Sequence, residues 1–368
     1  GILSMIRIQE ILDLVAAHNH EANLELIQKA YVFAAAAHVG QTRLSGEPYL
    51  SHPLAVAHRL AEMGFDEATI AAGLLHDTVE DTKATIEEID EQFGEEVADI
   101  VDGVTKISLI PFESKEEAQA ENIRKMILAM SHDMRVLMVK LADRAHNMST
   151  LDFQKPQKRI AQETMDIYAP LANRLGLHRI KQQLEDLSFK YLRPDLYGQI
   201  TKWLDDNQVV ERHIIDKVVT RLEDLLKSNG IHGTVYGRIK HKYSIYKKMQ
   251  HLSLTLDEMH DIMAFRVLVA DIKDCYAVLG LVHSQWKPVH GRFKDYISMP
   301  KANGYQSLHT TVIGPEGERI EIQIRTEEMH RQAEHGVASH WLYKEKGRVN
   351  PKDLEQFSWL REIFERQR

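Results

Sequence analysis

Two histidines and two aspartates in the first half of the chain have the residue types of ligands for a divalent metal. His76 and Asp77 are adjacent, His52 precedes them and Asp143 follows, each in a stretch with helical periodicity. Imidazole nitrogens and carboxylate oxygens suit a divalent transition metal, and this set leaves positions for water or substrate. An adjacent His-Asp pair alone could be coincidence, but the further His and Asp favour a metal site. The residue types do not choose among Mn²⁺, Fe²⁺, Zn²⁺ and Co²⁺.

Two further acids follow the His-Asp pair by about one helical turn. Glu80 stands four residues after His76, and Asp81 stands four residues after Asp77, so on a helix these side chains crowd adjacent faces. A metal-bound water is acidic enough to attack phosphorus, and a nearby carboxylate can orient or deprotonate it. We therefore expect Glu80 and Asp81 to act on the attacking water.

A second group of residues, in the other half of the chain, has the composition of a triphosphate site. The stretch 237–248 interleaves basic residues with a hydroxyl and aromatic residues, a mixture suited to gripping phosphates and stacking a base. On a helix, Lys240, Ser244 and Lys248 would share one face. A solvated basic helix surface is the competing interpretation of this stretch.

Two acids near the basic stretch favour catalysis. Asp261 stands at the entrance to a predicted buried strand, 262–269, and Glu321 lies in the strictly alternating segment 319–325. Carboxylates among cations are what Mg²⁺-assisted transfer from ATP requires. The sequence contains no Gly-x-x-x-x-Gly-Lys-Ser/Thr loop, which argues against a P-loop enzyme.

The elements that must position these two groups differ between the halves of the chain. Through about residue 190, apolar residues recur at the three- and four-residue spacing of helices. After Asn229-Gly230, strand-like alternation with turn signals predicts a mixed α/β structure, and Asn350-Pro351 is typical of a helix start. We therefore predict a multidomain fold, an all-α domain followed by an α/β domain with a mixed sheet. The expected divisions are 1–195 for the all-α domain, 196–228 for a helical connector, 229–345 for the α/β domain and 346–368 for a C-terminal helix.

The charge is also divided unevenly. The 46 basic and 54 acidic residues give a net charge of −8, which argues against a protein that binds nucleic acid through its average field. Segment 66–102 holds thirteen acids and one base, whereas segment 225–256 holds basic residues and no acid. This asymmetry suggests two domains with different ligands.

Simple features exclude other classes of protein. No apolar run approaches the ~18 residues of a transmembrane helix, and the first ten residues lack the pattern of a secretory signal. Cys275 is the only cysteine, which excludes an intrachain disulfide and a zinc site built on thiolates. We expect a cytoplasmic protein that does not contact membranes.

The first group of motifs resembles a known superfamily of hydrolases. In the HD-superfamily metal-dependent phosphohydrolases, a His, a His-Asp pair and a later Asp bind one metal. Segments 38–43, 49–53, 74–81 and 141–148 further resemble the hydrolase domain of long RelA/SpoT-type alarmone enzymes. In that family this domain removes the 3′-pyrophosphate from (p)ppGpp with manganese. The resemblance implies Mn²⁺ at this site and contacts to the guanine nucleotide from Arg43, Asn147 and Thr150.

The second group resembles the synthetase domain of the same family, whose fold is related to nucleotidyltransferases. The matching segments are 237–249, 260–267, 291–297, 300–310 and 321–326. The resemblance implies that Asp261 and Glu321 bind Mg²⁺, and that Glu321 also activates the acceptor 3′-hydroxyl. Tyr305 would stack on guanine, although partial burial in a loop is the commoner fate of a tyrosine. The implied contacts to ATP are Arg238, Lys240, Ser244 and Lys248, and those to GDP or GTP are Lys294, Lys301, Asn303, Tyr305, His309 and Gln323.

Together the two resemblances imply a bifunctional enzyme of the stringent response. One domain would hydrolyse ppGpp and pppGpp, and the other would transfer pyrophosphate from ATP to GDP or GTP. Long family members continue into regulatory domains that sense the ribosome, so we expect this chain to be an N-terminal catalytic fragment that binds neither ribosome nor nucleic acid directly. The alternatives are a hydrolase whose second domain only senses guanine nucleotides, and a protein whose two pockets only bind them.

Overall fold

The structure is a computed structural model that describes residues 7–41, 49–110, 133–151, 157–259 and 262–336. The chain forms two compact units, which divide between Leu175 and Gly176. The predicted divisions of the chain after residues 195, 228 and 345 stay a prediction. Arg43, Asp261 and the predicted C-terminal helix lie outside the described residues.

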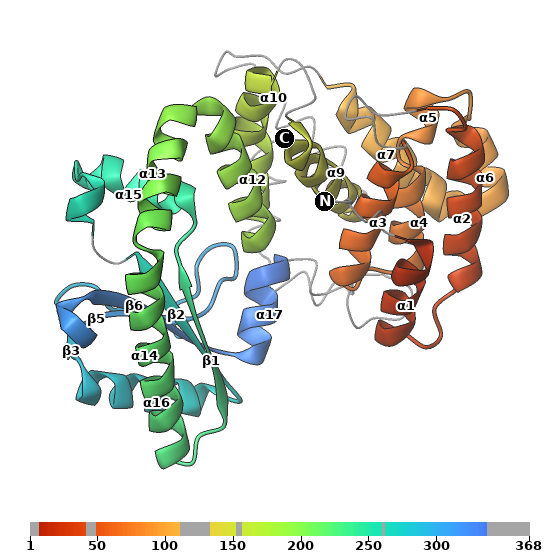
Figure 1. Cartoon of the computed structure of the whole chain (residues 1–368). Coiled ribbons are helices and arrows are strands. Elements are labelled where there is room, and N and C mark those ends of the chain that lie inside the picture. The colour runs from red at the N-terminus through yellow and green to blue at the C-terminus, as the bar shows by residue number, and fades with distance from the viewer. Residues whose placement is uncertain (1–6, 42–48, 111–132, 152–156, 260–261, 337–368) are drawn as a thin grey trace. The chain divides into compact units, whose positions relative to one another are not determined.

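The first unit is helical throughout the part that the structure describes, which confirms the predicted all-α class (Figure 1). No helix among the described residues of the chain is long and apolar enough to span a membrane. The helices are α1 Ile8–His18, α2 Leu24–Ala37, α3 Ser51–Glu62, α4 Glu67–Leu75, α5 Thr78–Asp81, α6 Ile86–Phe93, α7 Glu95–Ser108, α9 Arg135–Ser149, α10 Gln157–Glu163, a π-helical segment Thr164–Tyr168 and α11 Ala169–Arg174.

Helix α4 forms the centre of this unit. Its residues from Ala68 to Leu75 are all buried, and a helix that is apolar all round must be covered on every side. Helices α2, α3, α7 and α9 pack against it. Gly73 permits the close approach of α3, because a Cβ at this position would lie 2.8 Å from Leu60 Cδ1. His76 is the C-cap residue of α4, so tight core packing fixes its backbone.

The first turn of α9 is held by ion pairs around the buried side chain of Arg135. Arg135 forms ion pairs of 2.7 Å with Asp66, Glu96 and Asp133. Asp66 is the N-cap residue of α4, and Glu96 lies in the first turn of α7. Glu96 is half exposed, with 52% of its side-chain surface accessible, so the pair with Asp66, at 11%, is the one least screened by solvent. Arg135 therefore locks α9 against α4 and α7, which fixes where Asp143 of α9 lies.

The second unit is built on one mixed sheet, which confirms the predicted α/β class. The strand order is β1-β2-β6-β5-β3, with β4 pairing to β5, and the β2–β6 pair is parallel while the others are antiparallel. The elements are α12 His178–Leu192, α13 Pro194–Asp206, α14 Gln208–Ser228, β1 Gly233–Ile239, α15 Lys242–Leu252, β2 Met263–Val269, α16 Ile272–Gln285, β3 Lys287–Pro288, β4 Lys294–Asp295, β5 Leu308–Ile313, β6 Arg319–Thr326 and α17 Glu327–His335.

The two faces of this sheet carry different side chains. Phe265 of β2 and Ile322 of β6 are in register and buried. Helix α14 packs close to this face, because a Cβ on Gly237 of β1 would lie 2.7 Å from Ile215 Cγ2 and 2.9 Å from Phe265. Side chains alternate along a strand, so Glu321 stands on the opposite face. The sheet thus separates an apolar face under α14 from a polar face.

One carboxyl group interrupts the apolar face of α14. Ile214, Val218, Leu222 and Leu226 are buried at helical spacing, and Glu211 continues this stripe with only 7% of its surface exposed. Its Oε1 has no hydrogen-bond partner among the described residues. Burial, with a smaller contribution from nearby Glu318, raises the pKa of Glu211 to about 7.

This raised pKa predicts a pH-dependent loss of stability. The folded protein holds the Glu211 proton more tightly than the unfolded chain does, so stability falls as the pH rises from about 4.5 to about 7. We expect Glu211→Gln to remove this fall and to raise the Tm at pH 8 by roughly 2–4 °C, with little change at pH 4.5.

Thermal denaturation followed by circular dichroism across this pH range measures the effect. Glu223→Gln, at an exposed position on the same helix, is the control and should shift the Tm equally at both pH values. A Glu211→Gln curve parallel to that of the wild type would contradict the assignment.

Candidate metal centre and nucleotide site

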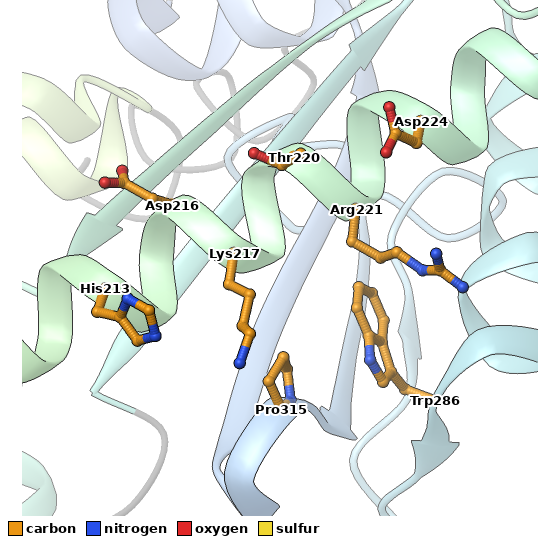
Figure 2. A pocket seen from close by; sticks show the side chains of 8 residues that line it. All are labelled: His213, Asp216, Lys217, Thr220, Arg221, Asp224, Trp286 and Pro315. Carbon is orange, nitrogen blue, oxygen red and sulfur yellow. The ribbon is translucent and has the colours of Figure 1, made fainter.

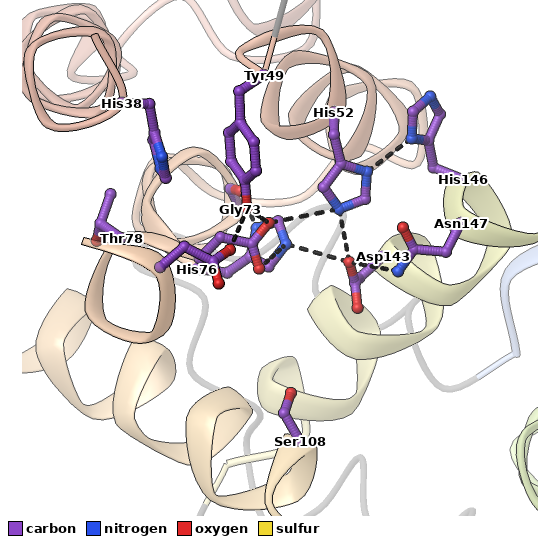
Figure 3. Close-up of polar contacts among 12 residues, drawn as sticks. His38, Tyr49, His52, Gly73, His76, Thr78, Ser108, Asp143, His146 and Asn147 are labelled. Atoms are coloured by element: carbon purple, nitrogen blue, oxygen red, sulfur yellow. Dashed lines mark hydrogen bonds and ion pairs between the residues drawn. The ribbon is translucent and has the colours of Figure 1, made fainter. Parts of the chain in front are cut away.

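The four predicted metal ligands converge in the first unit, and Figure 3 shows His52, His76 and Asp143 facing one another. Ligand atoms of His52, His76, Asp77 and Asp143 all lie within 4.8 Å of one another. His52 Nε2 is 2.6 Å from Asp143 Oδ1, and His76 Nε2 is 3.2 Å from the same oxygen. His76 Nε2 also lies 3.1 Å from Asp77 Oδ1. Helices α3, α4 and α9 thus assemble a set of donor atoms that could hold a divalent metal.

Both histidine rings are oriented by their second nitrogen. His76 Nδ1 lies 2.6 Å from the backbone oxygen of Gly73. That oxygen can only accept, so Nδ1 carries the proton, and the Nε2 of His76 faces the cluster. His52 Nδ1 lies 2.6 Å from Nδ1 of His146. Ligating histidines usually have such a partner, so the arrangement fits a metal.

Asp143 is the most strongly compensated acid of the cluster. Its Oδ1 faces the two histidines and accepts a hydrogen bond of 3.2 Å from Asn147 Nδ2, while its Oδ2 is 3.0 Å from Lys140 Nζ. Burial acts to raise the pKa of Asp143, but Lys140 and the two histidines hold it well below its usual range. Burial likewise acts to lower the pKa of His76, and Asp77 and Asp143 together raise it well above its ordinary value.

Tyr49 also belongs to this site, although its role was not predicted from the sequence. Its hydroxyl donates hydrogen bonds to Asp77 Oδ2, at 3.2 Å, and to Asp81 Oδ2. The ring of His38 stacks on the Tyr49 ring at 4.2 Å between centroids. Burial and the two carboxylates raise the pKa of Tyr49, so its hydroxyl stays protonated and remains a donor. Tyr49 thereby links Asp77, a proposed metal ligand, to Asp81.

The other predicted residues of this site that the structure describes lie on α5 and at the end of α9. Glu80 and Asp81 lie on α5, which follows Asp77 directly. Burial, and then the charge of Asp77, raise the pKa of Glu80, while Lys140 opposes them. Asn147 contacts Asp143, and Thr150 is the C-cap residue of α9. Their predicted catalytic and nucleotide-binding roles stay predictions.

In the second unit, the structure brings Glu321 and Lys240 together on the polar face of the sheet. Lys240 Nζ lies 2.7 Å from Glu321 Oε2, and Gln323 Nε2 donates a 3.2 Å hydrogen bond to Glu321 Oε1. Burial acts to raise the pKa of Glu321, but Lys240 outweighs it and lowers this pKa to about 2. Glu321 is therefore ionised at neutral pH. A residue predicted to bind ATP and one predicted to bind Mg²⁺ form an ion pair.

Tyr305 anchors a second polar cluster on this unit. Its hydroxyl lies 2.7 Å from His309 Nε2 and accepts a 3.3 Å hydrogen bond from Arg325 Nη1. Lys301 Nζ lies 5.2 Å from the centre of the Tyr305 ring. Burial lowers the pKa of His309 to about 4, so this imidazole is neutral at neutral pH. Tyr305 is only 9% exposed, and its stacking on guanine stays a prediction.

The remaining predicted nucleotide contacts come from elements around the same sheet. Lys294 of β4 pairs with His309 of β5, and Asn303 Oδ1 accepts a 3.2 Å hydrogen bond from the Tyr305 backbone. Arg238 lies on β1, and Ser244 and Lys248 lie on α15. The contact between Ser244 Oγ and His241, at 3.0 Å, shows that this hydroxyl already has a local partner.

Comparison with known proteins matches both halves of the chain. Residues 30–178 match the HD domain, and residues 237–348 match the region found in RelA/SpoT proteins. The chain belongs to the RelA/SpoT family. Its relatives include a GTP pyrophosphokinase of Myxococcus xanthus, which is 54% identical over 95% of this chain and 47% of that protein. The bifunctional (p)ppGpp synthase/hydrolase SpoT of Escherichia coli K12 is 48% identical over 99% of this chain and 52% of that protein.

The match to the family is long but does not extend over the whole length of these relatives. A further relative, the GTP pyrophosphokinase rsh of Brucella melitensis, is 47% identical over 98% of this chain and 49% of that protein. The chain spans about half the length of the curated relatives it matches.

The second unit also has a cavity beside α14 (Figure 2). It has a volume of about 520 Å³, and none of the predicted site residues lines it. Six of its eight lining residues lie on α14, and Trp286 and Pro315 supply the opposite side. The lining residues are His213, Asp216, Lys217, Thr220, Arg221, Asp224, Trp286 and Pro315.

The Tyr305 cluster yields a prediction about stability. Tyr305→Phe keeps the ring but removes the hydroxyl that both His309 and Arg325 contact, which leaves buried polar groups without a partner. We expect a loss of about 1–3 kcal/mol in the free energy of unfolding, measured by urea denaturation. Tyr276→Phe removes an exposed hydroxyl that bonds Asp295 at 2.7 Å and is the control. Equal losses in the two variants would contradict a buried, coupled cluster.

Proposed function

We propose that this chain is a bifunctional alarmone enzyme. The first unit would hydrolyse the 3′-pyrophosphate of ppGpp and pppGpp to give GDP or GTP and pyrophosphate. The second would transfer the β,γ-pyrophosphate of ATP to the 3′-hydroxyl of GDP or GTP. The observation that carries the proposal is the convergence of His52, His76, Asp77 and Asp143. This cluster lies in a chain whose second half matches RelA/SpoT proteins.

For hydrolysis, the proposed ligands of Mn²⁺ are the two histidines and two aspartates of the cluster. The metal would supply Lewis-acid activation of a water and of the phosphoryl oxygens. Glu80 is the proposed base, because burial and then the charge of Asp77 raise its pKa and make its carboxylate more basic. Tyr49 holds Asp81 next to Asp77, so Asp81 is placed to orient the water. Arg43, Asn147 and Thr150 are the proposed contacts to the guanine nucleotide.

For synthesis, Glu321 is the proposed base and, with Asp261, the proposed ligand of Mg²⁺. The ionised carboxylate of Glu321 fits a ligand of Mg²⁺, because its pKa of about 2 keeps it unprotonated. A base role requires that its ion pair with Lys240 give way to substrate and metal. It would accept the proton of the 3′-hydroxyl as that oxygen bonds to the β-phosphorus of ATP and AMP leaves. The cations Arg238, Lys240 and Lys248 would stabilise the charge on the transferring group.

The proposed ligands follow from these two sites. They are ATP, GDP or GTP, and (p)ppGpp. We propose no direct contact of this chain with nucleic acid, ribosome or membrane. The GDP/GTP contacts proposed are Lys294, Lys301, Asn303, Tyr305, His309 and Gln323. A reducing, cytoplasmic setting is part of the proposal, and it is supported by the single cysteine, which is buried.

A pair of variants tests the two activities separately. We expect Asp77→Ala to abolish Mn²⁺-dependent release of pyrophosphate from labelled ppGpp and to leave the transfer reaction intact. We expect Glu321→Gln to slow transfer from labelled ATP to GDP by about 10²–10⁴-fold, the usual contribution of a general base, and to leave hydrolysis intact.

Two exposed carboxylates provide matched controls. Asp99→Ala on α7 and Glu328→Gln on α17 should change neither reaction. Hydrolysis without transfer in the wild type would favour a hydrolase with a nucleotide-sensing second domain. Absence of both reactions would leave only nucleotide binding and would refute the proposal.

A further inference from the structure

A buried lysine contacts Asp143, one of the four proposed metal ligands. Lys140 lies one turn before Asp143 on α9, and its side chain is 8% exposed. Its Nζ lies 3.0 Å from Asp143 Oδ2 and 3.1 Å from Ser108 Oγ at the end of α7. An ammonium group with two partners inside a helical core is costly, because desolvation of a charge must be offset by its contacts. Packing alone does not explain a lysine here.

The two oxygens of Asp143 have different partners. Oδ1 faces the proposed metal position, since His52 Nε2 and His76 Nε2 both approach it. Oδ2 points away from the histidines toward Lys140. A carboxylate whose second oxygen is held by an ammonium group cannot turn to offer both oxygens to a metal without breaking that ion pair.

We propose that Lys140 is a positioning residue of the metal centre. It holds Asp143 Oδ2, so that Oδ1 alone is presented to the metal, and its positive charge offsets the carboxylates that crowd the site. This inference rests on the proposed metal-dependent function. It assigns a role to a residue that is not among the proposed metal ligands or nucleotide contacts.

The hydrogen bond to Ser108 gives Lys140 a fixed position. Ser108 is the last residue of α7, and its hydroxyl also donates to Val104 O at 3.0 Å. The ammonium group is therefore tied to two helices, α9 through its own backbone and α7 through Ser108. Partners that orient metal ligands commonly change metal affinity by about 10–100-fold when they are removed.

The test is Mn²⁺ binding measured by calorimetry on the whole chain, independent of any turnover. We expect Lys140→Met to weaken Mn²⁺ binding by about 10–100-fold. Lys140→Arg retains a cation that can reach Asp143 and should recover part of this loss. Lys106→Met removes an exposed lysine that pairs with Asp102 at 2.8 Å in the same unit, and it should bind Mn²⁺ like the wild type.

Asp77→Ala separates the failure of this inference from the failure of the proposed function. If the wild type binds Mn²⁺ no better than Asp77→Ala does, the metal-dependent function itself is wrong. If the wild type binds Mn²⁺ and Lys140→Met binds it equally or more tightly, the positioning role is wrong. Should Lys140→Met fail to fold by circular dichroism, Lys140→Gln, which keeps a hydrogen-bond donor without the charge, must still bind Mn²⁺ more weakly than the wild type.

Discussion

The first unit depends on keeping one buried carboxylate charged. Asp143 is 5% exposed, and an ionised carboxylate in such a place is stable only if it is paired and hydrogen-bonded. Four side chains contact this carboxylate directly, those of His52, His76, Asn147 and Lys140. A fifth, Ser108, contacts Lys140. They come from α3, α4, α7 and α9. The packing of these helices around α4, together with the Arg135 ion pairs, therefore brings the four proposed metal ligands together.

In the second unit, a β-sheet rather than packed helices places a carboxylate, that of Glu321, beside a cation. Strict alternation along β6 buries Ile320, Ile322 and Ile324 and places Glu321 on the other face. Register then decides its neighbours, because Ala264 of β2 and Thr311 of β5 lie beside Glu321 and leave room above it. Lys240 follows β1 and reaches the same point. A short side chain on each adjacent strand lets charged groups meet above the sheet.

The fold class and much of the candidate site could be predicted from the sequence, and the residues that could not be predicted were missed for a physical reason. The His-Asp pair and the alternation around Glu321 are local patterns, so both the fold class and the convergence of the proposed ligands could be predicted. Tyr49, His146 and Lys140 could not, because their roles depend on which helices pack together. For Lys140 and His146 a weak signal existed, since both lie three residues from Asp143 on one helix. Acids such as Glu87 and Glu91 in the acidic segment 66–102 are exposed to solvent. The number of acids in that segment was therefore a poor guide to the number of acids at the proposed metal centre.

The buried charged groups differ in sign between the two proposed sites, and this difference bears on the proposed ligands. In the second unit, Arg266 and Arg325 each have a buried Nε with no hydrogen-bond partner among the described residues. Burial, and then Arg325 and Arg238, lower the pKa of Arg266 to about 10. Cations that disfavour one another are relieved by a bound anion, so a nucleotide would stabilise this face in proportion to its phosphate charge. In the first unit the imidazole nitrogens and carboxylate oxygens of the cluster are instead donor atoms suited to a divalent cation. The buried cations of the second unit are thus matched to the proposed phosphate ligands, and the imidazoles and carboxylates of the first unit to the proposed metal.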